Sequence, residues 1–115
     1  GASQDIKQAT STARDMVTKY GFSSKLGLIN YDNDSDEVFI GRDFGHTRVY
    51  GENIASEIDN EVRDIINDCY AKAKRIISDY RGILDRTAQL LLEKEKIDRE
   101  EFEALFEGVE IKRYV

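Results

Sequence analysis

The sequence predicts a mainly α-helical fold: a bundle of about four helices with one short β-hairpin between the first and second helices. Three observations predict it. Apolar residues recur at helical spacing over most of the chain, one intervening segment is β-prone and rich in turn residues, and the internal glycines fall between the periodic segments. A length of 115 residues and a hydrophobic content of 40% suit one domain with a modest core.

The first helix is predicted over residues 1–21. Ser3 is the expected N-cap, and Gly21 stands where a left-handed residue ends a helix. Asp5 then falls in the first turn, where the helix dipole favours a negative charge by about 0.3–1 kcal/mol. From periodicity alone, the presence of an acid at position 5 is therefore explained by its contribution to helix stability. One face of the helix is apolar: Ile6, Ala9, Ala13, Met16, Val17 and Tyr20.

A β-hairpin is predicted over residues 25–44, with a loop over residues 45–51. Two short β-prone runs, 26–31 and 38–40, flank a loop rich in Asp and Asn. The hairpin would be marginal alone, so we expect it to pack against the helices or to join strands that are missing from this chain.

The acids of this hairpin suggest a calcium-binding loop, but the match is poor. Glu37 replaces the glycine required at the sixth position, and the flanking segments are β-prone rather than helical. Asx turns are the favoured interpretation. The four acids at ligand positions are Asp32, Asp34, Asp36 and Asp43.

Residues 52–108 are predicted to be helical, with Gly82 as the only glycine before the end of this region. Its first part is one long helix, in which apolar residues recur about every 3.7 residues from Ile54 to Tyr80. A second apolar column appears after the midpoint, so we expect the C-terminal half to be buried by more than one neighbour. Cys69 lies on the main column and is expected to be a buried thiol.

Two shorter helices complete the predicted bundle. The third is apolar nearly all round between residues 83 and 92, which predicts burial on several sides. The fourth has a capping box, with Asp98 as N-cap and Glu101 three residues later, and Gly108 is expected to end it. The tail over residues 109–115 has no strong pattern.

Composition excludes several classes of function. A formal net charge of −6 disfavours a general nucleic-acid or anionic-membrane binder. A single cysteine excludes an internal disulfide, and no apolar run approaches the roughly 18 residues that span a bilayer. The only histidine, His46, has no second histidine with which to share a metal. The chain does not begin with methionine, and we expect it to be a piece of a longer protein.

An ordered series of short motifs runs along the chain to about Phe106. It comprises Gly1-Ala2-Ser3-Gln4-Asp5-Ile6, Ala9-Thr10, Ala13-Arg14, Met16-Val17, Gly21-Phe22-Ser23, Leu26-Gly27, Ile58-Asp59, Glu61-Val62, Tyr70, Ala73 and Glu95-Lys96-Ile97. Together these motifs resemble the C-terminal part of the FtsH peptidase domain. That family consists of membrane-anchored, ATP-dependent zinc metalloproteases of the AAA+ class.

The resemblance implies a metal-binding role for Asp5. In that family zinc is held by two histidines of an H-E-x-x-H helix and by the aspartate of an Asp-Ile pair that opens a later helix, which Asp5 and Ile6 match. Two histidines and a carboxylate with an open position form a sound catalytic zinc site. This chain contains neither H-E-x-x-H nor an ATPase module, so we expect no catalytic residue and no cofactor-binding residue in it. Alone it should be inactive and should not retain zinc, and ATP with Mg²⁺ would bind only through the missing module.

The resemblance also implies partners for the whole protein: unfolded or membrane protein substrates and a homohexameric ring, with no nucleic acid. An N-terminal anchor outside this chain would attach that protein to the membrane of a bacterial cell, with the peptidase domain on the cytoplasmic side. A different class of function, a stand-alone helical adaptor that binds a partner without catalysis, is the alternative. The sequence immediately upstream of Gly1 separates the two, because only the protease requires H-E-x-x-H there.

Overall fold

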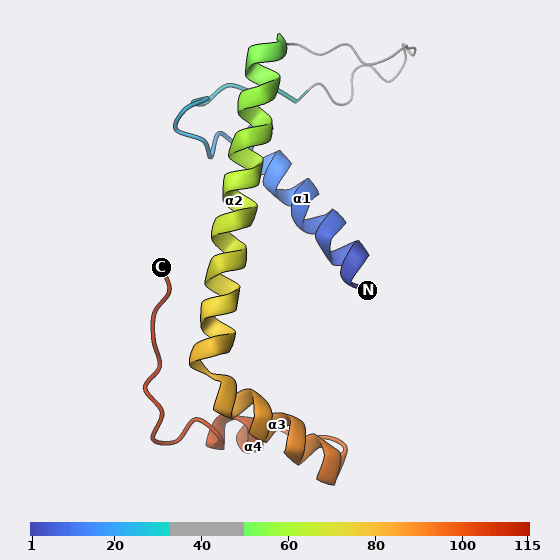
Figure 1. Ribbon diagram of the computed structural model, residues 1–115, viewed down its shortest axis with the longest axis vertical. Helices are drawn as coiled ribbons and strands as arrows, with labels where there is room; N and C mark the ends of the chain where they lie inside the picture. Colours follow the sequence, from blue (N-terminus) through green and yellow to red (C-terminus); the bar gives the residue numbers. More distant parts are fainter. Residues whose placement is uncertain (33–49) are drawn as a thin grey trace. The chain divides into compact units, whose positions relative to one another are not determined.

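The computed structural model describes residues 1–32 and 50–115, and that part of the chain is mainly helical, as predicted, with four α-helices and no strand (Figure 1). The helices are α1 (Ala2–Thr18), α2 (Glu52–Asp79), α3 (Arg81–Lys94) and α4 (Arg99–Ala104). The chain divides into two compact units, Gly1–Asp68 and Cys69–Val115, and α2 contributes to both. None of the helices in the described ranges combines the length and apolar character needed to cross a membrane.

Helix α1 begins ahead of its predicted N-cap, Ser3. Gly1 is the N-cap and no side chain caps the helix, so the expectation that Ser3 is the N-cap is wrong. The backbone closes the first turn without a cap side chain, because the Gly1 carbonyl accepts hydrogen bonds from the N–H groups of Gln4 and Asp5, both at 3.1 Å. Asp5 is therefore the fourth helical residue rather than the second.

Helix α1 ends at Thr18 with Lys19 as its C-cap, and Gly21 follows shortly after. This residue has φ +69°, in the left-handed region that was predicted for it. A Cβ at this position would lie 2.7 Å from Leu28 Cδ2 and 3.4 Å from Leu28 Cα. The left-handed backbone conformation therefore favours glycine at this position, whereas the Leu28 side chain, which is 90% exposed, is able to move aside.

The core of the first unit lies between α1 and the N-terminal half of α2. Its two most deeply buried side chains are Val17 of α1, at 0% exposure, and Ile58 of α2, at 1%. The predicted apolar face of α1 is buried only in its middle: Ala13 and Val17 are buried, whereas Ile6 is 66% exposed and Tyr20, beyond the end of the helix, is 63% exposed. The complete core cluster is Ala13, Val17, Leu26, Ile58 and Val62.

The predicted hairpin over residues 25–44 is not supported. Residues 25–32 form turns and coil, while the second expected arm, 38–40, and the loop acids Asp34, Asp36 and Asp43 lie outside the described residues, as does most of the 45–51 loop. The first arm bonds locally instead of pairing in a ladder. Gly27 N–H donates to Ser23 O at 2.9 Å, and Tyr31 N–H donates to Thr18 O at 2.7 Å.

Helix α2 confirms the predicted long helix, but its burial is the reverse of the prediction. Its buried residues, Ile58 and Val62, lie in the N-terminal half. In the C-terminal half Ile77 is 54% exposed and Tyr70 is 68% exposed, and Cys69 is exposed, so the expectation of a buried thiol is wrong. A widening apolar stripe marks a face that could be buried; it does not show that a neighbour covers it.

In the second unit, α4 folds back along α3. The Arg86 guanidinium donates to Leu105 O at 3.0 Å, and Lys94 forms an ion pair with Glu101. The predicted capping box at Asp98 and Glu101 is confirmed, although α4 ends at Ala104 and turns, not helix, lead to Gly108. The predicted burial of α3 on several sides is wrong: Ile83 is its one buried residue.

Candidate metal-ligand site

Asp5, the residue singled out as a metal ligand, lies in the first turn of α1 and is exposed. Its backbone N–H is bonded to Gly1 O, but its carboxylate forms no hydrogen bond or ion pair within residues 1–32 and 50–115. A carboxylate at the N-terminal end of a helix is favoured by the helix dipole. The carboxylate oxygens of Asp5 are therefore not engaged by the other side chains that the structure describes, and they can serve as metal donors.

The support for Asp5 comes from the other end of α1. Residues 1–9 are all exposed, whereas Ala13 and Val17 are anchored in the core. Arg14 adds an ion pair with Asp59 of α2 at 3.6 Å. At about 1.5 Å per helical residue, Asp5 stands roughly 12 Å along the helix from Ala13. Its position thus depends on the helix that carries it.

The described residues do not complete a metal site. Across residues 1–32 and 50–115, no three His, Cys, Asp or Glu side chains are grouped so that they could hold an ion. His46 lies outside the described ranges. A tetrahedral catalytic zinc needs three protein ligands, so Asp5 fits as one donor and this part of the chain does not supply the others.

The one acid of the calcium-loop pattern that the structure describes is Asp32. Its carboxylate forms an ion pair with Lys19 at 3.7 Å. The Asp32 N–H donates to the Asn30 side-chain oxygen at 2.8 Å, which is an Asx turn formed by Asn30. The Asx turns predicted for the acids of the loop remain a prediction, because the loop lies outside the described residues.

Two polar clusters were not found by sequence analysis. The buried Ser23 hydroxyl donates to Glu61 of α2, 38 residues away in sequence. In the second unit, Asp79 at the end of α2 accepts a hydrogen bond from the Tyr114 hydroxyl at 2.5 Å. No local pattern reveals pairs so distant in sequence.

Hydrogen bonds and ion pairs shift the pKa values of Asp79, Lys94 and Glu101. The Tyr114 hydroxyl and the Lys112 ammonium hold the pKa of Asp79 below its usual range. The hydrogen bond between Lys94 and Glu101 raises the pKa of the lysine and lowers that of the glutamate. These pairs are structural, and no catalytic cluster is evident among the described residues.

Comparison with known proteins identifies the family. The sequence model of peptidase family M41 matches residues 1–105. The chain belongs to peptidase family M41. The resemblance to FtsH-type proteases is thereby confirmed, and M41 membership extends over both units of the structure.

This M41 chain is similar to curated proteins that are named as FtsH proteases. It is 47% identical over 111 residues to "ATP-dependent zinc metalloprotease FtsH 1" of Thermoanaerobacter sp., covering 96% of this chain and 18% of that protein. It is 50% identical over 105 residues to the "ATP-dependent zinc metalloprotease FtsH" of Caldicellulosiruptor bescii, covering 91% and 17%. The FtsH of Mycobacterium tuberculosis is 46% identical over 110 residues, covering 96% and 14%. The M41 chain thus spans less than a fifth of the length of these relatives.

Proposed function

We propose that this chain is the part of an ATP-dependent zinc metalloprotease that supplies the third protein ligand of the catalytic zinc, the carboxylate of Asp5. The observation that carries the proposal is the exposed Asp-Ile pair in the first turn of α1, in a chain that matches the M41 family from its first residue. The relatives are named as zinc metalloproteases, and a carboxylate oxygen is an ordinary zinc ligand.

The exposed apolar residue beside the ligand supports this role. Ile6 follows Asp5 directly and is 66% exposed. Covering an exposed isoleucine side chain with another apolar surface removes it from water and stabilises the assembly. In the whole protease, we infer that the part carrying the remaining zinc ligands covers Ile6 and so brings Asp5 to the metal.

The chemistry divides between this chain and the rest of the protein. Zinc, when bound, polarises the scissile carbonyl and activates a water molecule. Asp5 contributes a negatively charged donor, and the packed C-terminal half of α1 holds the helix that presents it. Because the chain has one histidine and no H-E-x-x-H, we expect it to be inactive and unable to retain zinc alone.

The wider properties of the proposed protease follow from its family. They comprise degradation of unfolded or membrane proteins in quality control, threading driven by ATP and Mg²⁺ in an ATPase module, a homohexameric ring and a membrane anchor, all involving parts outside this chain. The relatives' printed names support ATP dependence and zinc. M41 membership favours this function over the adaptor alternative.

The test is Asp5→Asn in the full-length protein that contains this chain. Loss of a group that merely orients a zinc ligand costs about 10–100-fold in metal affinity. Loss of the ligand itself should therefore lower zinc affinity and ATP-dependent proteolysis by at least about 100-fold. Zinc content, measured by mass spectrometry after dialysis, and degradation of an unfolded substrate report the two effects.

Asp64→Asn is the matched control, since Asp64 is an exposed aspartate on α2 in the same unit. It should leave zinc content and proteolysis unchanged. A role of Asp5 in helix stability alone would change unfolding by about 0.3–1 kcal/mol and leave zinc content intact. Retention of zinc and full proteolysis by Asp5→Asn would therefore exclude Asp5 as the ligand.

A further inference from the structure

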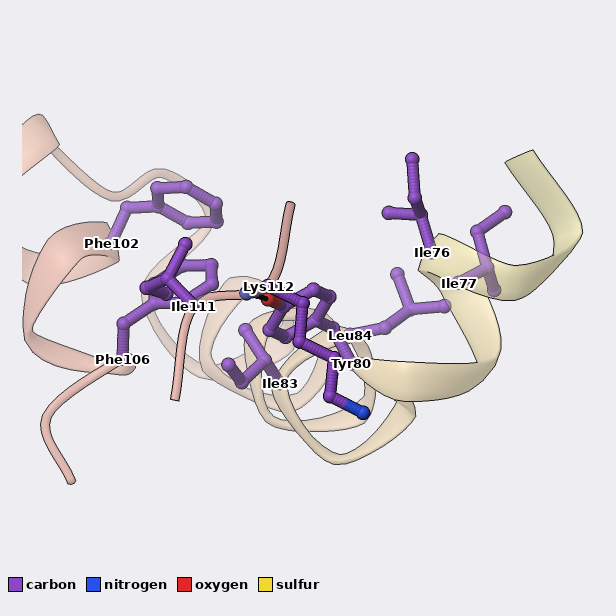
Figure 2. A pocket seen from close by; sticks show the side chains of 9 residues that line it. All are labelled: Ile76, Ile77, Tyr80, Ile83, Leu84, Phe102, Phe106, Ile111 and Lys112. Atoms are coloured by element: carbon purple, nitrogen blue, oxygen red, sulfur yellow. Dashed lines mark hydrogen bonds between the residues drawn. The ribbon is translucent and has the colours of Figure 1, made fainter. Parts of the chain in front are cut away.

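The second unit contains an apolar groove of about 380 Å³ near the junction of α2 and α3 (Figure 2). Its walls come from the end of α2, from α3 and from the α4 region, and the tail also lines it. The apolar side chains from the helices and the turn after α4 are Ile76, Ile77, Ile83, Leu84, Phe102 and Phe106. Ile77 and Leu84 are about half exposed, so the groove is open to solvent on that side.

The tail lines the groove through Ile111 and Lys112. Ile111 stays 64% exposed, so its side chain sits shallowly against the groove. The residues after Gly108 form no helix or strand, and the tail is therefore held by individual contacts rather than by regular secondary structure.

Those contacts concentrate on two consecutive residues, Asp79 and Tyr80. The Tyr80 hydroxyl accepts a hydrogen bond from the Lys112 N–H at 2.6 Å and donates to Glu110 O at 3.3 Å. The Asp79 carboxylate accepts a hydrogen bond from the Tyr114 hydroxyl at 2.5 Å and forms an ion pair with Lys112 Nζ at 3.6 Å. These contacts fasten the tail on both sides of Ile111.

The position of Asp79 is informative because it opposes the helix dipole. Asp79 is the last residue of α2, and the last turn of that helix contains no basic residue. A negative charge is unfavourable at a helix C-terminus. Tyr114 and Lys112 of the tail offset this cost, and the charge of Arg75 on α2 adds to their effect. The Arg75 guanidinium also lies 5.6 Å from the centre of the Tyr114 ring.

We propose that residues 109–115 form a detachable strap, fastened by Asp79 and Tyr80, which covers one side of the apolar groove and opens it on release. The polar fastening fixes the strap, and the shallow seating of Ile111 makes its release easy. This inference stands on contacts within the second unit and is independent of the metal-ligand role of Asp5.

The first test measures amide exchange by NMR in the 115-residue chain. The Lys112 amide is bonded to the Tyr80 hydroxyl, so it should exchange at least about tenfold more slowly than in an unstructured peptide. Tyr80→Phe removes the acceptor and should abolish this protection. Tyr70→Phe, at an exposed tyrosine of α2, is the control and should leave it unchanged.

The second test uses Asp79→Ala, because Asp79 does not line the groove. The variant should release the strap, abolish protection of Lys112 and raise the fluorescence of an apolar dye severalfold, while helix content by circular dichroism is unchanged. Asp85→Ala, which breaks the exposed 3.0 Å pair with Arg81 on α3, should change neither readout. Unprotected Lys112 in the wild type, or full protection and unchanged dye binding in Asp79→Ala, would overturn the proposal.

Discussion

The buried hydroxyl of Ser23 donates a hydrogen bond of 2.5 Å to a carboxylate oxygen of Glu61 on α2. The same hydroxyl oxygen accepts the N–H of Leu26 at 3.2 Å, and Leu26 is itself part of the core cluster. One side chain therefore ties the turn after α1 to α2. Because α1 carries Asp5 at its other end, this connection helps to define the helix on which the proposed metal ligand stands.

Ser23→Ala should destabilise the first unit. Hydrogen bonds to charged groups contribute about 1.5–3 kcal/mol, and we expect a loss of that size in the free energy of unfolding. Urea denaturation followed by circular dichroism measures it. Ser24→Ala, at the exposed neighbouring serine, should stay within about 0.5 kcal/mol of wild type. Equal stability of the two variants would show that the Ser23–Glu61 contact contributes nothing.

Ile58 should be the most sensitive core position of α2, since it is 1% exposed and packs in the cluster that joins α1 to α2. Ile58→Val should cost about 0.5–1.5 kcal/mol and Ile58→Ala about 2–5 kcal/mol in the free energy of unfolding, because a cavity is left. Ile77→Val, at a position 54% exposed, is the comparison and should cost less than about 0.5 kcal/mol. A larger effect at Ile77 than at Ile58 would contradict the burial described for α2.

The capping box of α4 predicts a graded response at Asp98. Its carboxylate accepts the Glu101 N–H at 2.8 Å, and the Glu101 carboxylate accepts the Asp98 N–H in return. Asp98→Ala should destabilise α4 by about 0.5–2 kcal/mol, whereas Asp98→Asn keeps a good cap and should be nearly neutral. Exchange of the Glu101 amide measures both. Equal exchange in the alanine and asparagine variants would argue against the cap.

The strap should stay bound to Asp79 and Tyr80 at intermediate pH and should be released in strong acid and in strong alkali. The hydrogen bond from Tyr114, and after it the charge of Lys112, lowers the pKa of Asp79 from its ordinary 3.8. The stabilisation that ionised Asp79 gives to the strap is therefore present above pH 3.8 and is lost as the pH falls through the lowered pKa. Partial burial and the hydrogen bond to Asp79 raise the pKa of Tyr114 above its ordinary 10.0. The stabilisation from the Tyr114 hydroxyl is complete below pH 10.0 and is lost as the pH rises through the raised pKa of Tyr114.

NMR signals of the Tyr114 ring measure this pH dependence, and Tyr114→Phe assigns them. They should be constant near neutral pH and move toward unfolded-peptide values at both extremes. Ring signals that stay unchanged from neutral pH to pH values well below 3.8 would contradict the role given to Asp79.

Local patterns predicted what local interactions determine. The 3.7-residue recurrence identified α2, and the spacing of Asp98 and Glu101 identified the capping box, because both depend on neighbours within a turn. The predictions of burial failed where burial depends on segments that are distant in sequence. Cys69 lies on an apolar column and is nevertheless exposed, and the expected first arm of a hairpin bonds to the end of α1 instead.

The candidate site shows the same division. Periodicity explained Asp5 only as an acid at the start of a helix, and the structure confirms its place in the first turn. Its proposed role as a ligand came from the family resemblance, because the other donors are not in the described residues. Likewise, no sequence pattern foresaw the Ser23–Glu61 contact or the fastening of the tail on Asp79, since 38 and 35 residues separate the partners.

The most direct test of the central claim is an experimental structure of the full-length protein with zinc bound. The account predicts a carboxylate oxygen of Asp5 at about 2.0–2.2 Å from the metal, with two histidines from outside this chain completing the protein ligands. A zinc ion coordinated by another carboxylate, with Asp5 outside the coordination sphere, would contradict it.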